Sequence, residues 1–80
     1  MDTYTTVKTR LMRLCEERRM SIHKLAMESG IAPSTIKNIL YGKSKNPGIV
    51  TLKMLCDGLG ITLVDFFNTP DFLKLEQEIL

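Results

Sequence analysis

The sequence predicts an all-α fold, a compact bundle of five helices with a short sixth helix as an option at the C-terminus. Three observations lead to this prediction. Apolar residues recur every three or four positions along most of the chain, which is typical of helices with one buried face. Glycines and prolines fall between these segments, where helices end and begin. No run alternates between apolar and polar residues in the manner of a strand.

The chain has 80 residues, of which 44% are hydrophobic, and this favours one globular domain over disorder. No apolar run approaches the ~20 residues of a membrane span, and the N-terminus lacks the apolar stretch of a signal peptide. We therefore expect a cytoplasmic protein with no membrane partner. Cys15 and Cys56 fall at core positions without a CxxC motif, so we interpret them as small buried hydrophobic residues rather than as a disulfide or metal site. No cofactor is expected.

The first predicted helix begins at Asp2 or Thr3, either of which can cap it, and runs to about Arg18. Its apolar residues are spaced by three, four and three positions: Tyr4, Val7, Leu11 and Leu14. Its other face is charged and is expected to lie in solvent: Lys8, Arg10, Arg13 and Glu17.

The segment 21–42 predicts two short helices joined by a tight turn. Ser21 is a good N-cap for the first of them, and Gly30 suits the left-handed residue that ends it. Pro33 suits the first turn of the second helix, and Gly42 ends it. A small residue in the first helix, the glycine turn and an apolar residue in the second are what a helix-turn-helix requires. An ordinary helical hairpin in a small bundle is the alternative.

The second of these helices has two different faces. With Ile36, Ile39 and Leu40 turned inward, its outward face carries short polar or hydrogen-bonding side chains, with Thr35 at the flank: Ser34, Lys37, Asn38 and Tyr41. Asparagine can pair with adenine and lysine can donate to guanine, so this face fits a DNA major groove. A simple solvated face is the alternative.

Charge is distributed unevenly along the chain, although the net charge is only +2. Residues 21–53 carry five lysines and one carboxylate, Glu28, whereas residues 54–80 carry five carboxylates and one lysine. No carboxylate occurs between Glu28 and Asp57. A positive middle and an acidic end fit a protein that meets phosphate on one side, although chance clustering on a solvated face would look the same.

The rest of the chain predicts a fourth helix over Ile49–Leu59, ended by Gly60, and a short fifth helix capped by Thr62. A break at 68–70 divides the chain into a helix-turn-helix domain, residues 1–68, and a tail, residues 69–80. The tail is read as a last helix over Asp71–Leu80 that packs on the domain, as a frayed end, or as a dimer contact.

These residues together resemble the lambda-repressor-like helix-turn-helix family, also called the XRE or Cro/repressor type, over about Val7 to Phe67. The resemblance is carried by motifs in a fixed order: Leu25-Ala26, Gly30, Ser34-Thr35-Ile36, Gly42-Lys43, Pro47, Leu59-Gly60-Ile61 and Phe66-Phe67. It implies a five-helix bundle and a function in binding double-stranded DNA, as in small regulators of Gram-positive bacteria and their mobile elements.

The resemblance also implies roles for particular residues. Base contacts are implied for Pro33, Ser34, Lys37 and Asn38, and we add their neighbours on the same helix, Thr35 and Tyr41. Phosphate contacts are implied at the start of the first motif helix and in the loop after the second: Ser21, His23, Lys43, Lys45 and Asn46. Three departures stand out: Ile22 where glutamine is common, Ala32 where the cap is often serine or threonine, and the apolar Cys15 and Leu40 where an arginine and a glutamate often pair.

The leading hypothesis is a sequence-specific regulator that binds a palindromic operator as a homodimer, with the second motif helix in the major groove. The alternative is a protein-interaction module, of the antitoxin or anti-repressor type, that binds a protein partner at the C-terminal tail. An enzyme is not expected, because the sequence shows no paired carboxylates, no nucleophile with a base and no cluster of metal ligands.

Overall fold

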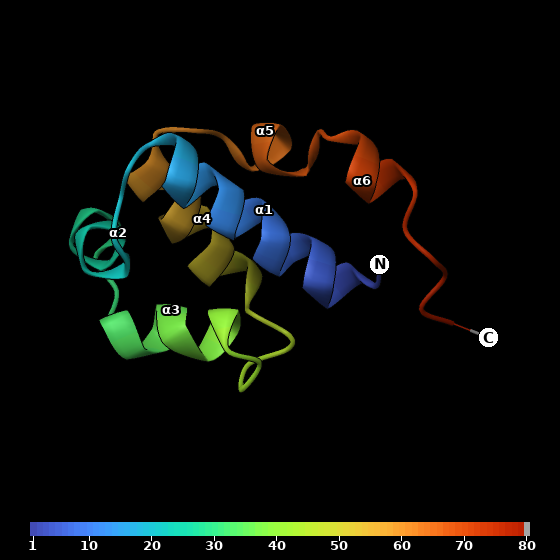
Figure 1. Ribbon diagram of the computed structural model, residues 1–80, viewed down its shortest axis with the longest axis horizontal. Coiled ribbons are helices and arrows are strands. Elements are labelled where there is room, and N and C mark those ends of the chain that lie inside the picture. The colour runs from blue at the N-terminus through green and yellow to red at the C-terminus, as the bar shows by residue number, and fades with distance from the viewer. Residues whose placement is uncertain (80) are drawn as a thin grey trace.

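The computed structural model describes residues 1–79, and these contain helices and loops but no strand. The predicted all-α class is therefore confirmed. Six helices follow one another along the chain (Figure 1): α1 Thr3–Glu17, α2 Ile22–Ser29, α3 Pro33–Leu40, α4 Ile49–Leu59, α5 Leu63–Phe67 and α6 Pro70–Leu73.

The C-terminal helix is present but shorter than the range predicted for it. The sequence allows a helix over 71–80, whereas α6 is one turn long and residues 74–79 are not helical; Leu80 lies outside the described residues. One turn seldom outweighs the cost of helix nucleation unless packing holds it. Phe72 packs against the core and Leu75 is half-buried, but Leu73 and Ile79 are 86% and 78% exposed, so little apolar packing supports a second turn.

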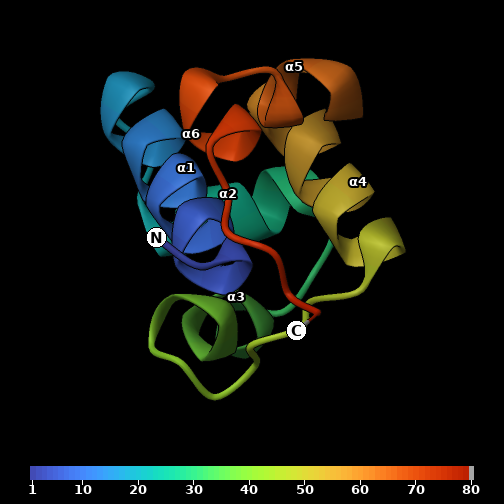
Figure 2. The ribbon, with the colours of Figure 1, turned by 90° about the vertical axis from the view of Figure 1, so that its right-hand side faces the viewer.

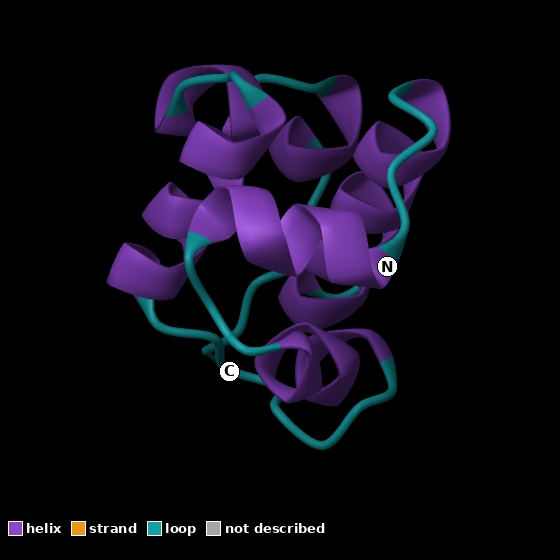
Figure 3. Cartoon of the chain, turned by 90° about the vertical axis from the view of Figure 1, so that its left-hand side faces the viewer, coloured by secondary structure: helices purple, strands orange, loops and turns teal. Residues whose placement is uncertain are grey.

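The helix α1 lies at one edge of the bundle and α4 at the opposite edge (Figure 2). The helix α3 lies below α1 in Figure 1, and α5 and α6 lie above it. Figure 1 shows α2 end-on and α3 lengthwise, and Figure 3, turned by 90°, shows the reverse. The two helices therefore cross steeply, as a helix-turn-helix requires.

The core is formed by one side chain or more from each of α1 to α5. Its buried members are Val7, Leu11, Leu14, Leu25, Ala26, Ile36, Ile39, Leu52, Leu55, Cys56, Leu59 and Phe66. The predicted apolar faces turn toward this core, although Tyr4, Cys15 and Leu40 are only half-buried. Burial raises the pKa of the Cys15 and Cys56 thiols, and both cysteines are free.

Helix ends follow the predicted signals. The side chains of Asp2, Ser21 and Thr62 each accept the N–H of the residue three positions later, which caps α1, α2 and α5. Gly30 and Gly60 end α2 and α4 with positive φ of 69° and 74°, a conformation that glycine adopts without a Cβ penalty.

The helix α1 also supplies side chains that cap other helices, which the sequence did not indicate. Arg18 donates its Nε–H to the Leu59 carbonyl at the end of α4, 2.9 Å away. Arg10 donates to the Asp65 and Phe66 carbonyls of α5, each at 2.9 Å, and is not the free surface cation that its spacing predicts. Arginine near a helix C-terminus satisfies free carbonyls and opposes the negative end of the helix dipole.

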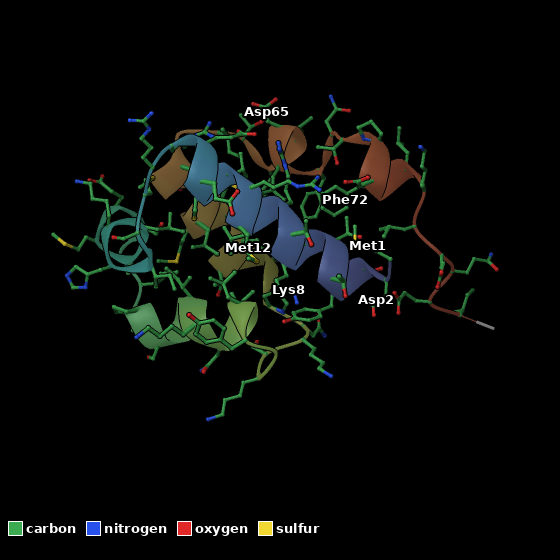
Figure 4. The ribbon with its side chains drawn as sticks, viewed as in Figure 1. Met1, Asp2, Lys8, Met12, Asp65 and Phe72 are labelled. Carbon is green, nitrogen blue, oxygen red and sulfur yellow. The ribbon has the colours of Figure 1, made fainter. Side chains whose placement is uncertain are left out.

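An aromatic cluster joins the C-terminal helices to this scaffold. The rings of Phe66 and Phe67, and those of Phe67 and Phe72, meet edge to face with centroids 5.0 Å apart. Figure 4 shows Phe72 in the space between α6 and α1. The helix α6 is consequently part of the packed structure, and the segment after it returns to the start of α1, where the Thr3 hydroxyl donates to the Glu78 carboxylate at 2.7 Å.

Candidate nucleic-acid interface

The turn between α2 and α3 fixes how α3 is presented. Gly30 reverses the chain, and the N–H of Ile31 donates to the Ala26 carbonyl in α2 at 3.2 Å. Ala32 has no side chain with which to cap α3, but its carbonyl accepts the Thr35 N–H at 3.0 Å. The helix therefore begins with a backbone bond and with Pro33, whose fixed φ suits this position.

Opposite faces of α3 have opposite exposure. Ile36 and Ile39 are 0% and 1% exposed and hold the helix on the core, with Leu40 half-buried beside them. The residues predicted to read bases lie on the other side as one stripe with spacings of three, one and three: Ser34, Lys37, Asn38 and Tyr41, all exposed. Pro33 and Thr35 are half-buried at its edge. The structure thus brings four of the six residues onto one open face.

The loop after α3 is folded back onto the helix rather than free. Gly42 has φ of 88°, and the Ser44 N–H donates to the Asn38 carbonyl at 2.8 Å. Lys43, Lys45 and Asn46 are exposed in this loop, next to the C-terminal end of α3 (Figure 1). The predicted phosphate-binding side chains of the loop therefore adjoin the stripe on α3.

Two further predicted phosphate contacts lie at the start of α2. The Ser21 oxygen accepts the Lys24 N–H at 3.0 Å, which leaves its own O–H free to donate. His23 is exposed on the first turn of α2. Both residues are accessible, and neither has an acidic partner among the described residues.

Ion pairs divide the lysines of the positive region into two groups. Lys24 pairs with Glu28 at 2.9 Å and Lys53 pairs with Asp57, each across one helical turn. Within residues 1–79, Lys37, Lys43 and Lys45 are in no ion pair. The unpaired lysines are the three on α3 and its loop, so unpaired positive charge lies on and beside the exposed stripe of α3.

The fold also brings acidic residues to this loop that the sequence spacing did not reveal. Hydrogen bonds from Thr5 lower the pKa of the Asp2 carboxyl, and the charge of Lys45 lowers it further, so Asp2 lies near the loop. Asp2, Lys45, Asn46 and Glu78 line one cavity of about 550 Å³ between α1, the loop and the tail. Residues 29–56 contain no carboxylate, but the fold places Asp2 and Glu78 close to the loop in this segment.

One residue that the sequence assigned only to the core also touches α3. The Tyr4 hydroxyl donates to the Ile39 carbonyl at 2.6 Å, joining the first turn of α1 to the last turn of α3. The apolar spacing of α1 placed Tyr4 on the buried face but gave no partner for its hydroxyl. A contact across 35 residues has no local signature in a single sequence.

The described part of the chain gives two further results. No helix in it is long and apolar enough to cross a membrane. No three side chains among its histidine, cysteine, aspartate and glutamate residues gather closely enough to hold a metal ion.

Similar proteins were found among family descriptions and solved structures. Residues 10–71 match the Cro/C1-type HTH DNA-binding domain. The crystal structure of the prophage Lp1 protein 11 has a TM-score of 0.79 and 33% identity, covering 94% of this chain and all of that one. The wild-type restriction-modification controller protein C.Esp1396I has a TM-score of 0.72 and 26% identity, covering 80% of this chain and 81% of that one.

A mutant of the same controller protein has a TM-score of 0.79 and 25% identity over 95% of this chain and all of that one. No curated protein is similar enough in sequence to match. The family match spans most of the chain, includes the whole of α2 and α3, and agrees with the steep crossing of these helices. This chain belongs to the family of Cro/C1-type helix-turn-helix DNA-binding domains.

Proposed function

We propose that this protein is a sequence-specific regulator of transcription that binds double-stranded DNA with α3 in the major groove. The observation that carries the proposal is the exposed stripe on α3, which is backed by two fully buried isoleucines and continued by unpaired lysines. A helix fits the major groove, where each base pair shows a distinct pattern of donors and acceptors. The similarity to a restriction-modification controller protein supports a regulatory role.

In this proposal the exposed side chains have two tasks. Asn38, Lys37 and Ser34 read base edges, and further contacts come from Tyr41 in the stripe and from Pro33 and Thr35 at its edge. Lys43, Lys45 and Asn46 bind phosphates beside α3, and Ser21 and His23 bind them at the start of α2. Lys37, Lys43 and Lys45 form no ion pair within residues 1–79, which favours these phosphate contacts at low salt.

We further propose that two copies bind a palindromic operator, with half-sites one helical turn, ~34 Å, apart. A single small module buries only about 600–1,000 Å² on DNA, so one copy alone gives limited affinity. The C-terminal elements offer apolar surface for a second copy, because Val64 and Leu73 are 74% and 86% exposed. No catalysed reaction is part of the proposal.

The test is selection from a pool of randomised duplexes by wild type and by the double variant Lys37→Ala/Asn38→Ala. We expect wild type to enrich a palindrome and the variant to bind that palindrome on the order of 100-fold less tightly, because each base contact contributes about 1–3 kcal/mol of discrimination. Both side chains are exposed, so the free energy of unfolding should change by less than about 0.5 kcal/mol.

The matched control is Lys24→Ala/Glu28→Ala, which removes an exposed ion pair from α2 and leaves the net charge unchanged. It should retain the operator within about twofold, since exposed pairs contribute little. Failure of folded wild type to enrich any sequence would contradict the proposal. If the double variant still enriches the palindrome, the base contacts are made by residues other than Lys37 and Asn38.

A second candidate function is a protein-interaction module that binds a protein partner through the C-terminal tail. The tail supports it, because Leu73 and Ile79 are exposed beside the carboxylates of Glu76 and Glu78. Removal of residues 70–80 would also remove Phe72 from the aromatic cluster, so a cut after Lys74 is the cleaner test. Loss of dimer or partner binding by this folded truncation would assign residues 75–80 to that interface, and unchanged association would exclude residues 75–80 from it.

A further inference from the structure

We infer that Tyr4 is a positioning residue for DNA recognition, whose hydroxyl fixes the C-terminal end of α3 relative to the rest of the bundle. This inference rests on the proposed function, because it concerns how accurately α3 is presented to a base pair. Tyr4 lies in the first turn of α1, on the face toward α3. It is half-buried.

The carbonyls at the end of α3 show why this hydroxyl matters. The last carbonyls of any helix lack intrahelical partners and need others. The Lys37 carbonyl accepts the Tyr41 N–H at 2.8 Å, and the Asn38 carbonyl accepts the Ser44 N–H at 2.8 Å. The next carbonyl, that of Ile39, accepts the Tyr4 hydroxyl at 2.6 Å. The first two bonds come from the same segment as α3, whereas the third comes from a different helix.

The Tyr4 bond is also unlike the other forces that hold α3. Within residues 1–79 it is the one side-chain hydrogen bond that joins α3 to another helix. Apart from the turn that joins it to α2, α3 is otherwise held by apolar packing, chiefly of Ile36 and Ile39, which is strong but not directional. A hydrogen bond weakens steeply away from its preferred angle, so it resists the rotation and sliding that apolar packing permits.

The position of this bond links both parts of the interface. Ile39 directly follows Asn38, the residue proposed to pair with a base. A Cβ added to Gly42 would lie 3.8 Å from the Tyr4 hydroxyl oxygen, so the hydroxyl also sits beside the glycine at which the loop begins. Tyr4 lines the same cavity as Lys45 and Asn46. One hydroxyl is thus placed where the base-reading helix passes into the phosphate-binding loop.

The substitution Tyr4→Phe isolates the hydroxyl from the ring. Phenylalanine keeps the apolar contacts and the ring over which Lys8 Nζ lies, 5.6 Å from its centroid. The control is Thr6→Val, which removes a hydroxyl from the same helix. That hydroxyl donates at 2.9 Å to the Asp2 carbonyl within the first turn, and Thr6 is 2% exposed, so it cannot contact DNA. Both variants lose one hydrogen bond to a backbone carbonyl.

The first measurement uses free protein. Amide hydrogen exchange of Tyr41 and Ser44, whose N–H groups bond the end of α3, should accelerate about fivefold in Tyr4→Phe relative to amides of the α4 core, because a typical hydrogen bond is worth a factor of this order. The control should leave this ratio at the wild-type value. An unchanged ratio in Tyr4→Phe would overturn the inference, whether or not a DNA target is known.

The second measurement uses the palindrome selected by wild type and an unrelated duplex of equal length. Tyr4→Phe should bind the palindrome about fivefold to tenfold less tightly and the unrelated duplex within about twofold, since base contacts need accurate placement whereas phosphate attraction does not. Thr6→Val should change neither affinity by more than about twofold at a temperature where both variants are fully folded. Equal losses on both duplexes, or equal losses in both variants, would overturn the positioning role.

The two measurements separate the two claims. If folded wild type selects no palindrome, the proposed function fails, and the exchange ratio still decides whether Tyr4 fixes the end of α3. If wild type selects a palindrome and Tyr4→Phe binds it as tightly as wild type does, the proposed function stands and the role of Tyr4 fails.

Discussion

The contact between α2 and α4 and the exposed face of α3 are built on different requirements. At the first, shape decides: α2 packs more closely on α4 than on any other helix, and Gly58 of α4 lies against Ser29 of α2. At the second, charge and exposure decide, because the side chains of the α3 stripe contact solvent and carry unpaired lysine. Close packing between α2 and α4 maintains the fold, whereas the exposed side chains of α3 can be substituted without altering the fold.

The two requirements, close packing and exposed charge, therefore fall on different helices of the helix-turn-helix. The helix α2 buries Leu25, Ala26 and Ser29, and so serves mainly as the support. The helix α3 buries Ile36 and Ile39 and exposes Ser34, Lys37 and Asn38, the side chains proposed for recognition. Substitutions in the α2–α4 contact should therefore lower stability, and those on the stripe or its loop should lower DNA affinity at unchanged stability.

The largest effect on stability is expected from Gly58→Ala. The added Cβ would collide with the Ser29 hydroxyl and lie 3.0 Å from the Ser29 backbone nitrogen. Overpacking of this kind costs about 1–3 kcal/mol. Alanine recovers up to about 1 kcal/mol through its higher helix propensity. We expect the free energy of unfolding, measured by urea denaturation, to fall by about 1–2 kcal/mol.

The variant Ser29→Ala sharpens this test. The Ser29 hydroxyl oxygen is buried and has no hydrogen-bond partner among the described residues, so its removal should leave stability unchanged or raise it. In combination with Gly58→Ala it should restore only part of the loss, because the Ser29 backbone nitrogen remains in place. Full stability of Gly58→Ala alone would show that the two helices are not held by close fit.

A smaller effect is expected on the recognition side from Lys43→Ala/Lys45→Ala. Loss of two phosphate contacts should reduce the slope of log affinity against log salt by about 2, with the free energy of unfolding unchanged. Fluorescence anisotropy with the selected duplex between low and moderate salt measures this slope. Lys53→Ala is the control, since Lys53 is paired with Asp57 on α4. An unchanged slope in the double variant would show that Lys43 and Lys45 do not contact DNA phosphates.

The smallest effect is expected at the cap of α1, and it depends on pH. Hydrogen bonds from Thr5 depress the pKa of Asp2 below its ordinary value of 3.8 in the folded protein. The stabilisation is therefore fully present above that value and is lost as pH falls through the depressed pKa. Asp2→Ala should be slightly less stable than wild type at pH 6, and the difference should shrink toward pH 2. If the stability difference between wild type and Asp2→Ala grew on acidification, the Asp2 carboxylate would not be stabilising α1 as a cap.

Much of the fold was accessible from local patterns in the sequence. The caps at Ser21 and Thr62 and the glycine at the end of α4 were placed correctly, because each depends on residues within one turn. The caps from Arg10 and Arg18 were missed, since an arginine on the polar face of a helix looks like a surface charge until its partner is known. The length of α6 was missed because its support depends on packing rather than on spacing.

The candidate site, like the fold, could be predicted from the sequence only where it depends on local patterns. The exposed stripe on α3 followed from helical periodicity, because one buried face determines the opposite one. The Tyr4 bond and the nearness of Asp2 to Lys45 did not follow, because each joins segments far apart in the chain. The spacing of residues in one sequence predicts which face of a helix is buried. Only the folded structure shows which residues each face contacts.

The most direct test of the central claim is a titration of wild-type protein with its selected duplex, followed by amide resonances. We expect the largest shifts and broadening on residues 33–46, with a smaller set at the start of α2. Amides in the middle of α4 should change little. Shifts concentrated on α5 and α6, with α3 unaffected, would contradict the claim that α3 is the recognition element.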